Sequence, residues 1–432
     1  MVNDKLYSPK WTRWIVLLLR LAVGSVFAFS GFVKAIDPWG VLYKFQDYVA
    51  VLGLDVLSPF LLLGAFLISI FEFVLGVCLL IGAYRKISVR AAFLLMLVMT
   101  PLTLWLAVTG AVPDCGCFGE AITLSNVATF WKNVVLLGAV GYLLRYNVAI
   151  GNLYSPSIQW IVTIVTIAFI TIVSLYGYFY QPMIDFRPYK TGVSIVPNDL
   201  SSYSSDDYVF IYERNGERKE FSIDELPSDS DSTWTFIDRK EKPCRIEKTS
   251  LEPSGIVIEE EGEDITGDVI LSEGEQILLV FSDMDDIDIS YTYLINMIDD
   301  YARQRNADVM GVAAATNESI NEWNDLSMAT YPIYNVEDTE LKILARGNPA
   351  VVFLKDGKIV WKRTLQSISA ARVEAAINGS GDFSWIAEDY NGESRLKVLS
   401  GAYVLFMIIV LIFNRSYRVY KFSSRLIKKN QK

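Results

Sequence analysis

The sequence contains no histidine, and this absence removes several classes of chemistry at once. Without an imidazole there is no Ser-His-Asp triad, no Cys-His dyad, no His-ligated haem and no His-bearing zinc site. Charged residues are also scarce: they make up 20% of the 432 residues, against 52% hydrophobic ones. That balance is too apolar for a soluble protein of this length, so the composition predicts a membrane protein. Any chemistry falls to the four cysteines, to carboxylates and lysines, or to a bound cofactor.

The net charge of −10 is distributed unevenly along the chain. Residues 181–396 hold 42 acidic and 20 basic side chains, whereas the rest of the chain holds 7 acidic and 19 basic ones. An acidic extramembrane block is therefore joined to a basic, apolar remainder. Because the block has no basic stripe, we expect no nucleic-acid partner.

Apolar runs as long as a bilayer is thick predict six membrane-spanning helices, so the lipid bilayer is the first expected partner. The first run lacks a small-residue cleavage site after its apolar stretch, so we interpret it as a retained signal anchor. The predicted spans are Trp11–Val33, Pro59–Gly82, Ala91–Val108, Ser125–Leu144, Ile158–Tyr180 and Leu396–Phe413.

The orientation of these spans follows from lysines and arginines in the short loops. With the N-terminus inside, the N-terminal segment, the second loop, Arg145 and the basic tail 414–432 all fall on the cytoplasmic side. The third loop contains no lysine or arginine and falls outside, as does the acidic block; Lys34 and Lys44 in the first loop are mild exceptions. We therefore predict a multi-pass protein with both termini in the cytoplasm and an extracytoplasmic soluble block.

The first part of that block, residues 181–271, is predicted to be β-rich. Tyr208–Glu213 and Arg218–Ser222 flank Asn215-Gly216, which is a strong hairpin signal, and Trp234–Ile237 predicts another strand. The acidic stretch that follows, Glu259–Asp268, is typical of a solvated linker, with a Ca²⁺ site as the other interpretation.

The second part, residues 272–379, alternates predicted strands and helices, beginning with Gln276–Ser282 and Ile289–Ala302. This order, with Pro349 opening a terminal hairpin, resembles the thioredoxin fold, and the resemblance implies a cis-proline there that faces a redox site. The family's Cys-x-x-Cys would fall at Ser282–Asp286, where this sequence has no thiol and has acids that oppose a thiolate. We expect a redox-inactive domain that docks or holds a partner.

The loop after the third span carries the most informative motif, Pro113-Asp-Cys-Gly-Cys-Phe-Gly119. The predicted topology places it where disulfides persist. A direct bond between Cys115 and Cys117 would close a strained ring, and strain makes a disulfide more oxidising. The pair is thus a candidate redox couple for a client dithiol. The alternatives are structural or inert cysteines, including a bond from one of them to Cys244, or a two-thiolate metal site, which would need further ligands; we assign no metal. Cys78 is expected to be a packed core residue.

Among the charged residues of the predicted spans, Arg20, Glu72 and Lys132 lie more than one turn from either end, and such residues are functional candidates. Arg20 and Glu72 lie at similar depths from the predicted cytoplasmic ends of their helices, so we predict an intramembrane ion pair. Its role is either structural or part of a proton path to a lipid-soluble electron carrier. Lys132 lies about two turns below the outer end of the fourth span. It either approaches Cys115 or Cys117 and stabilises a thiolate, or extends to the interface.

The first 150 residues also carry several motifs in a defined order: Arg20, Ser30-Gly-Phe-Val-Lys-Ala-Ile-Asp-Pro38, Glu72 with Gly76 and Gly82, Cys115-Gly-Cys-Phe-Gly119, and Thr129-Phe-Trp-Lys-Asn133. Together they resemble the DoxX/MauE group of four-helix membrane proteins. The likeness extends to longer bacterial members, in which Asp185-Phe-Arg-Pro-Tyr-Lys190 follows the fifth helix and a thioredoxin-like block is appended.

That resemblance implies a place in a bacterial inner (cytoplasmic) membrane and a role near thiol or quinone redox chemistry. DoxX-like proteins are associated with thiosulfate–quinone or oxidative-stress systems. MauE (methylamine utilisation) is associated with maturation of a disulfide-rich amine dehydrogenase subunit, beside a separate thioredoxin-like protein. A link of this chain to methylamine metabolism does not follow from the resemblance.

We therefore predict a membrane all-α four-helix bundle of the DoxX/MauE type (1–150), two further spans (158–180 and 396–413) and an extracytoplasmic α/β thioredoxin-like domain (272–379) inserted between them. The leading hypothesis is thiol/disulfide or quinone-linked redox, or maturation of an extracytoplasmic client protein, through Cys115 and Cys117. It implies a thiol-disulfide oxidoreductase, with a quinone as the candidate cofactor. The alternatives are a non-enzymatic membrane assembly or docking factor that uses the redox-inactive domain, and a small-molecule or quinone carrier within the bundle.

Overall fold

The computed structural model divides the chain into two compact units. The first, the membrane unit, comprises Met1–Arg187, Arg363–Ser369 and Gly381–Lys432. The second, the α/β unit, comprises Pro188–Lys362 and Ala370–Ser380. The structure describes residues 10–112, 114–147, 150–195, 208–214, 217–221, 235–241, 256–260, 263–270, 273–378 and 392–430.

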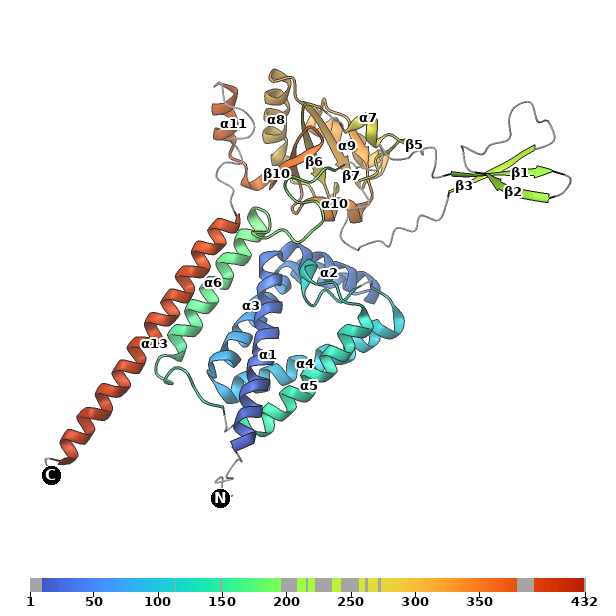
Figure 1. Ribbon diagram of the computed structural model, residues 1–432. Coiled ribbons are helices and arrows are strands. Elements are labelled where there is room, and N and C mark those ends of the chain that lie inside the picture. The colour runs from blue at the N-terminus through green and yellow to red at the C-terminus, as the bar shows by residue number, and fades with distance from the viewer. Residues whose placement is uncertain are drawn as a thin grey trace. The chain divides into compact units, whose positions relative to one another are not determined.

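Six helices of the membrane unit, among the described residues, are long and apolar enough to cross a bilayer (Figure 1). They confirm the number and order of the predicted spans. Helices α6 and α13 run side by side, where the rings of Phe169 and Tyr403 stack with centroids 4.4 Å apart. The six are α1 (Lys10–Ile36), α3 (Leu61–Ile81, preceded by the 3₁₀ turn η1, Asp55–Phe60), α4 (Arg85–Thr109), α5 (Asn126–Arg145), α6 (Gln159–Phe179) and α13 (Gly392–Asn430).

Helices α1 and α3 pack with almost no space between their backbones. A Cβ on Gly31 would lie 2.2 Å from the backbone nitrogen of Phe73, and one on Gly76 would lie 2.2 Å from that of Ala28. Small residues permit such close approach between apolar helices, which have no hydrophobic drive to associate within lipid. These contacts fix the register of the two helices and place Glu72 beside the turn of α1 that contains Gly31.

A helix that was not predicted, α2 (Pro38–Leu52), occupies the first connection. Its start follows from two local signals, because the Asp37 side chain accepts a hydrogen bond from the Gly40 amide and Pro38 occupies the first helical position. It ends at Gly53, whose φ of +63° is readily adopted only by glycine. This helix is too short to cross a bilayer, and it carries side chains to the site described below.

The α/β unit is built on a mixed sheet of seven strands in the order β10-β9-β6-β7-β8-β4-β5. Strand β6 pairs parallel to β7 and antiparallel to β9, and six of its seven residues are buried. The apolar run predicted this burial. The strands are β4 (Glu259–Glu260), β5 (Glu263–Asp264), β6 (Glu275–Phe281), β7 (Asp308–Ala313), β8 (Ile333–Asn335), β9 (Ala350–Lys355) and β10 (Lys358–Thr364).

Helices alternate with these strands, as the sequence predicted for an α/β domain. The Asn348–Pro349 peptide bond is cis, as the resemblance to thioredoxins implied. The helices are α7 (Thr266–Val269), α8 (Thr292–Gln304), α9 (Asn317–Ser327), α10 (Asp338–Leu344) and α11 (Ala370–Ile377), with short 3₁₀ turns η7 (Ile289–Tyr291) and η8 (Leu365–Ser367).

The acidic stretch Glu259–Asp268 is not a linker, which corrects the prediction. Strand β4 pairs with β5, and its Glu259 pairs with Asn335 of β8, so the segment extends the sheet. Ile256 and Ile258, immediately before it, belong to the same buried core as β6. Ile265 and Ile270 pack on this core as well, so isoleucines on either side of the acidic residues hold the segment against it.

A second, three-stranded antiparallel sheet has the order β2-β1-β3 and comprises β1 (Tyr208–Arg214), β2 (Glu217–Phe221) and β3 (Thr235–Glu241). These strands match the three predicted from the sequence. The predicted turn at Asn215-Gly216 lies outside the described residues.

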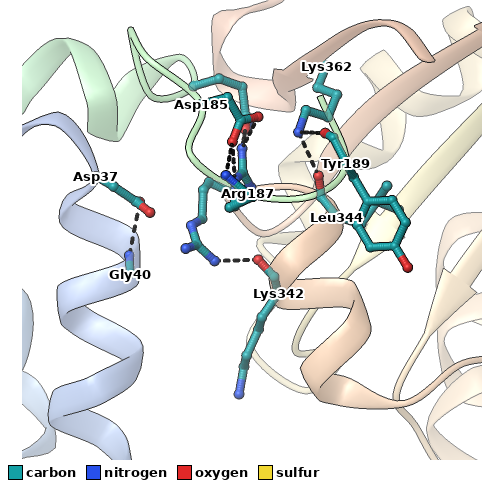
Figure 2. A network of polar contacts seen from close by, with 10 residues as sticks. Asp37, Gly40, Asp185, Arg187, Tyr189, Lys342, Leu344 and Lys362 are labelled. Carbon is teal, nitrogen blue, oxygen red and sulfur yellow. Dashed lines mark hydrogen bonds and ion pairs between the residues drawn. The ribbon is translucent and has the colours of Figure 1, made fainter. Parts of the chain in front are cut away.

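The segment Asp185–Lys190, which follows α6, is divided between the two units: it ends the membrane unit at Arg187 and begins the α/β unit at Pro188. Each half has its own polar contacts (Figure 2). In the membrane unit, the fully buried Arg187 donates from Nε and a terminal nitrogen to the two carboxylate oxygens of Asp185, at 2.8 and 2.9 Å. In the α/β unit, the buried Lys362 donates to the carbonyls of Tyr189 and Leu344. These contacts order the motif within each unit.

Candidate thiol site

The loop between α4 and α5 brings Cys115 and Cys117 together. Their Sγ atoms lie 2.9 Å apart, and both thiols are free and half-buried. Gly116 between them adopts φ = +62°, a conformation that side-chain-bearing residues rarely adopt. The glycine therefore allows the chain to reverse within one residue, so that both sulfurs meet.

Helix α2 and the loop's own aspartate hold this turn in place. The Gly116 amide donates to Asp114 Oδ1 at 2.8 Å, and Lys44 Nζ binds Asp114 Oδ2 at 3.0 Å. The Tyr48 hydroxyl donates to the carbonyl of Cys115 at 3.0 Å. The unpredicted helix thus fixes the backbone on the N-terminal side of the sulfur pair.

A buried ion pair lies on the other side of the loop. Lys34 Nζ on α1 donates to both carboxylate oxygens of Glu72 on α3, at 2.7 and 2.8 Å. Only 8% of Lys34 and 5% of Glu72 is exposed, so the two charges compensate each other away from solvent. Ser30, one turn before Lys34, places its Oγ 2.6 Å from Glu72 Oε2 and 2.7 Å from the carbonyl of Cys117. The ion pair is thereby linked to the thiol loop through a single hydroxyl.

The predicted Arg20–Glu72 ion pair is wrong. Arg20 instead donates to the carbonyl of Gly151 at 2.7 Å, and a Cβ added to Gly82 at the end of α3 would lie 2.9 Å from its guanidinium. The prediction counted depth from the ends of the two apolar runs. In the structure α1 extends well past the end of α3 on that side, so Arg20 is level with Gly82 and not with Glu72.

Lys132 of α5 lies beside the thiol loop, as one of its two predicted positions required. Its Nζ is 4.2 Å from the centroid of the Phe118 ring, the residue after Cys117. The next residue, Asn133, is buried and donates to Thr103 Oγ1 on α4 at 3.2 Å. That contact ties α5 to α4 at the level of the site.

The surroundings separate the pKa values of the two thiols. The hydrogen bond from Cys115 lowers the pKa of Cys117 to about 6, and the positive charges of Lys132 and Lys34 act in the same direction against burial. The pKa of Cys115 is raised well above its usual range by the same hydrogen bond and by burial. Burial also raises the pKa of the Tyr48 hydroxyl, which keeps it a donor. Cys117 is therefore the sulfur that carries the negative charge near neutral pH.

Two cavities meet at this site. The loop cavity, about 110 Å³, lies between α2 and the thiol loop and is lined by both cysteines and by apolar side chains such as Phe45. The bundle cavity, about 50 Å³, lies between α1, α4 and α5 and is lined by Lys132. Lys34, Met99 and Cys117 line both. Cys115 thus faces one cavity, whereas Cys117 lies between the two.

The family comparison concerns this part of the chain. Residues 12–146 match the model of the family described as "Methylamine utilisation protein MauE". The helical bundle belongs to the MauE family. Every residue of the thiol site named above, from Ser30 to Asn133, lies inside the MauE match, as does Arg20.

Outside the MauE match, residues 207–246 match a "Domain of unknown function (DUF8463)", which covers the three-stranded sheet. No curated protein and no solved structure matches this chain. The MauE match ends at residue 146, before α6, so α6, α13 and the α/β unit lie beyond it.

Of the other two cysteines, only Cys78 lies among the described residues, and it does not line either cavity of the thiol site. Cys78 is buried among the apolar side chains of α3, as expected for a core residue. Cys244 lies outside the described residues. Among the residues that the structure describes, no group of three or more Cys, Asp or Glu side chains is placed to hold a metal ion.

In the α/β unit, the loop after β6 holds no thiol, in agreement with the sequence. Asn348 closes this loop, because its Nδ2 donates to the carbonyl of Asp283 at 2.6 Å and its Oδ1 accepts from the Asp283 amide at 3.3 Å. The Asn348 amide thereby connects the loop after β6 to the residue before Pro349.

Four residues of the thiol site were not predicted to belong to it: Ser30, Lys34, Lys44 and Tyr48. Lys34 was assigned to the first loop because the predicted span ended at Val33, whereas α1 continues to Ile36. Ser30 and Lys34 are four residues apart and so share one helix face, a signal the sequence contained.

Proposed function

We propose that this MauE-family membrane protein exchanges disulfides with an extracytoplasmic client protein through Cys115 and Cys117. The observation that carries the proposal is the pair of sulfurs 2.9 Å apart, at the wall of the loop cavity and beside two lysines. A vicinal pair with unequal proton affinities is suited to accept a dithiol's electrons, since the sulfur of lower pKa is the better leaving group.

The exchange proceeds in two displacements. A client thiolate attacks Cys115 Sγ of the oxidised pair, a client–Cys115 disulfide forms, and Cys117 leaves with the bonding electrons as a thiolate. The second client thiolate then attacks the client sulfur, which releases Cys115. The client gains one disulfide and loses two protons and two electrons, and the pair becomes reduced by the same amount.

Reoxidation of the pair requires a two-electron acceptor, for which we propose a membrane quinone. The quinone would take two electrons and two protons and leave as quinol, while the Cys115–Cys117 bond re-forms. The apolar lining of the loop cavity supports an acceptor drawn from the lipid phase. The disulfide exchange does not depend on the identity of the acceptor, because any two-electron oxidant that reaches the pair would re-form the Cys115–Cys117 bond.

We further propose that the thiol loop and the α/β unit face the extracytoplasmic side of a bacterial inner membrane, with both chain termini in the cytoplasm. The distribution of lysine and arginine supports this orientation. The thioredoxin-like domain 272–379, whose sequence has no cysteine, would then hold the client while the MauE domain supplies the sulfur chemistry.

A direct test uses the full-length protein in lipid nanodiscs, oxidised with a mild thiol oxidant and mixed with a reduced dithiol peptide. We expect one peptide disulfide to form per Cys115–Cys117 pair reduced, as counted by alkylation and mass spectrometry. Cys115→Ser and Cys117→Ser should abolish the transfer, whereas Cys78→Ser, the matched control, should not. Transfer that persists in both serine variants would refute the proposal.

The orientation is tested in whole cells. A membrane-impermeant maleimide should label the reduced pair before lysis, and labelling only after lysis would reverse the proposed topology. A second outcome would favour the docking function over the redox one. In that outcome the orientation is as proposed, the serine variants keep full biological activity, and deletion of residues 272–379 abolishes that activity.

A further inference from the structure

The buried network of Ser30, Lys34 and Glu72 contains two acceptors for the single hydroxyl hydrogen of Ser30. Ser30 Oγ lies 2.6 Å from Glu72 Oε2 and 2.7 Å from the carbonyl oxygen of Cys117, and both neighbours accept hydrogen bonds when Glu72 is ionised. A serine hydroxyl donates one hydrogen, so it serves only one of them. Both contacts are satisfied together when Glu72 carries a proton, donates it to Ser30 Oγ, and Ser30 donates to Cys117.

Lys34 lies between the Glu72 carboxylate and the cysteines. It binds both oxygens of Glu72 and lines both cavities together with Cys117. While Glu72 is ionised, the ammonium charge is neutralised by the carboxylate. When Glu72 is protonated, that charge is available to a thiolate at Cys117.

We propose that Lys34, Glu72 and Ser30 form a proton and charge relay in which Glu72 takes up a proton as Cys117 becomes a thiolate, so that Lys34 transfers from the carboxylate to the sulfur. This inference rests on the proposed thiol–disulfide function and assigns the proton of that reaction. Lys34 and Ser30 are positioning residues, and Glu72 is the proton site.

The step balances. Reduction of the Cys115–Cys117 bond takes two electrons and two protons: one proton goes to Cys115 Sγ and the other to Glu72, while Cys117 keeps its electron pair as a thiolate beside Lys34. Reoxidation returns the electrons to the quinone acceptor and both protons leave. The proton reaches Glu72 through the bundle cavity, which is lined by Glu72, Lys34 and Cys117.

Every element packed against the network contributes groups that act on it. Helix α4 contributes apolar side chains such as Met99 to both cavities. The titratable and charged groups that line the two cavities are Lys34 and Asp37 of the α1–α2 segment, Lys44 and Tyr48 of α2, Glu72 of α3, Asp114, Cys115, Cys117 and Glu120 of the loop, and Lys132 of α5.

The relay predicts how many protons accompany the two electrons. Full-length protein in nanodiscs is equilibrated with dithiothreitol of known redox ratio at pH 7 and pH 8, and the reduced fraction of the pair is measured by alkylation. Each proton taken up changes the equilibrium constant for reduction tenfold per pH unit, after correction for the reagent. We expect about a hundredfold change in the wild type and about a tenfold change in Glu72→Gln. Equal dependence in the two proteins would overturn the relay.

A second readout tests Lys34. The pH midpoint of Cys117 alkylation in the reduced protein should rise in Lys34→Gln, so that alkylation at pH 6.5 slows about tenfold, and Lys34→Arg should restore it. Lys86→Gln, at the opposite end of α4 from the thiol loop, is the matched control and should leave the midpoint unchanged. An unchanged midpoint in Lys34→Gln would contradict the charge transfer.

The double variant Lys34→Gln/Glu72→Gln removes both charges together and so avoids an unpaired buried ion. It should show the raised alkylation midpoint of Cys117, and a wild-type midpoint in the folded double variant would refute the relay. The two proposals fail separately: a relay that fails leaves client oxidation intact, whereas a failed function leaves the dithiol peptide reduced whatever the pH dependence.

Discussion

Gly31 of α1 stands against the backbone nitrogen of Phe73 of α3 so closely that a Cβ would lie 2.2 Å from it. The adjacent residues on the two helices, Ser30 and Glu72, are hydrogen-bonded. The helix contact and the buried polar network are therefore parts of one structure. Separation of the helices at Gly31 would separate the hydroxyl from the carboxylate.

Gly31→Ala should destabilise the membrane unit, because the added methyl group meets backbone atoms, which have no alternative rotamer. We expect a loss of about 1–3 kcal/mol, seen as a lower thermal unfolding midpoint of the full-length protein in detergent. Gly138→Ala is the matched control, since a Cβ on Gly138 of α5 meets nothing within 4 Å. It should be neutral or slightly stabilising. Equal effects of the two substitutions would show that the close approach does not matter for stability.

The membrane spans were predictable from the sequence because hydropathy reports the length of an apolar run, and this is a local property. The contact between α1 and α3 is not local. The Arg20–Glu72 prediction failed because the register of the two helices depends on Gly31 and Gly76, and no count along one helix contains that information. The partner of Glu72 was missed because Lys34 lies in the last turn of α1, just past the predicted end.

Two other differences have local causes that compositional reasoning overlooked. Helix α2 has a recognisable start at Asp37-Pro38 and a glycine end, but its context was a short loop between apolar runs. The segment 259–268 was predicted as a linker from its charge, although isoleucines before, within and after it mark a chain that returns to the core. The proximity of the two thiols was predictable because a single residue separates them and that residue is a glycine, which can adopt the positive φ of the turn.

The pH dependence of alkylation should distinguish the two thiols. With a pKa of about 6, Cys117 is mostly ionised at pH 7, whereas Cys115 is held protonated, so iodoacetamide should modify Cys117 first. Below pH 6 the rate at Cys117 should fall about tenfold per pH unit, because the thiolate is the nucleophile. Site-resolved mass spectrometry of the reduced full-length protein measures both rates.

The same measurement on Cys115→Ala tests the cause. Removal of the neighbouring thiol removes the hydrogen bond that contributes most to the lowered pKa of Cys117, so its midpoint should rise toward about 8.5. Alkylation of Cys117 at pH 7 should then slow. A midpoint that stays near 6 would assign the low pKa to the lysines alone.

Tyr48→Phe should loosen the thiol loop while leaving the fold in place. The substitution removes one hydrogen bond, from the hydroxyl to the Cys115 carbonyl, and leaves the ring, so we expect a loss of about 0.5–1.5 kcal/mol. Alkylation of Cys115 should become several-fold faster because the backbone on its side is less restrained. Tyr146→Phe, at the end of α5 and away from the loop, is the control and should leave both cysteines unchanged. If alkylation of Cys115 does not respond, the loop is held by Asp114 and Lys44 without help from the tyrosine.

Asn348→Ala should open the loop that follows β6 in the α/β unit. The Asn348 amide both donates to the carbonyl of Asp283 and accepts from its amide, and these contacts connect the loop to the residue before Pro349. Without them the backbone amide of Asp283 loses its partner, so its hydrogen exchange in the full-length protein should accelerate by an order of magnitude or more, while exchange in the buried strand β6 stays slow. Asn378→Ala, at the exposed end of α11, is the matched control. If the α/β unit holds the client as proposed, faster exchange at Asp283 should be accompanied by weaker client binding. The rate at which Cys115 and Cys117 oxidise a free dithiol peptide should stay unchanged. Slower peptide oxidation in this variant would instead tie the loop to the sulfur chemistry itself.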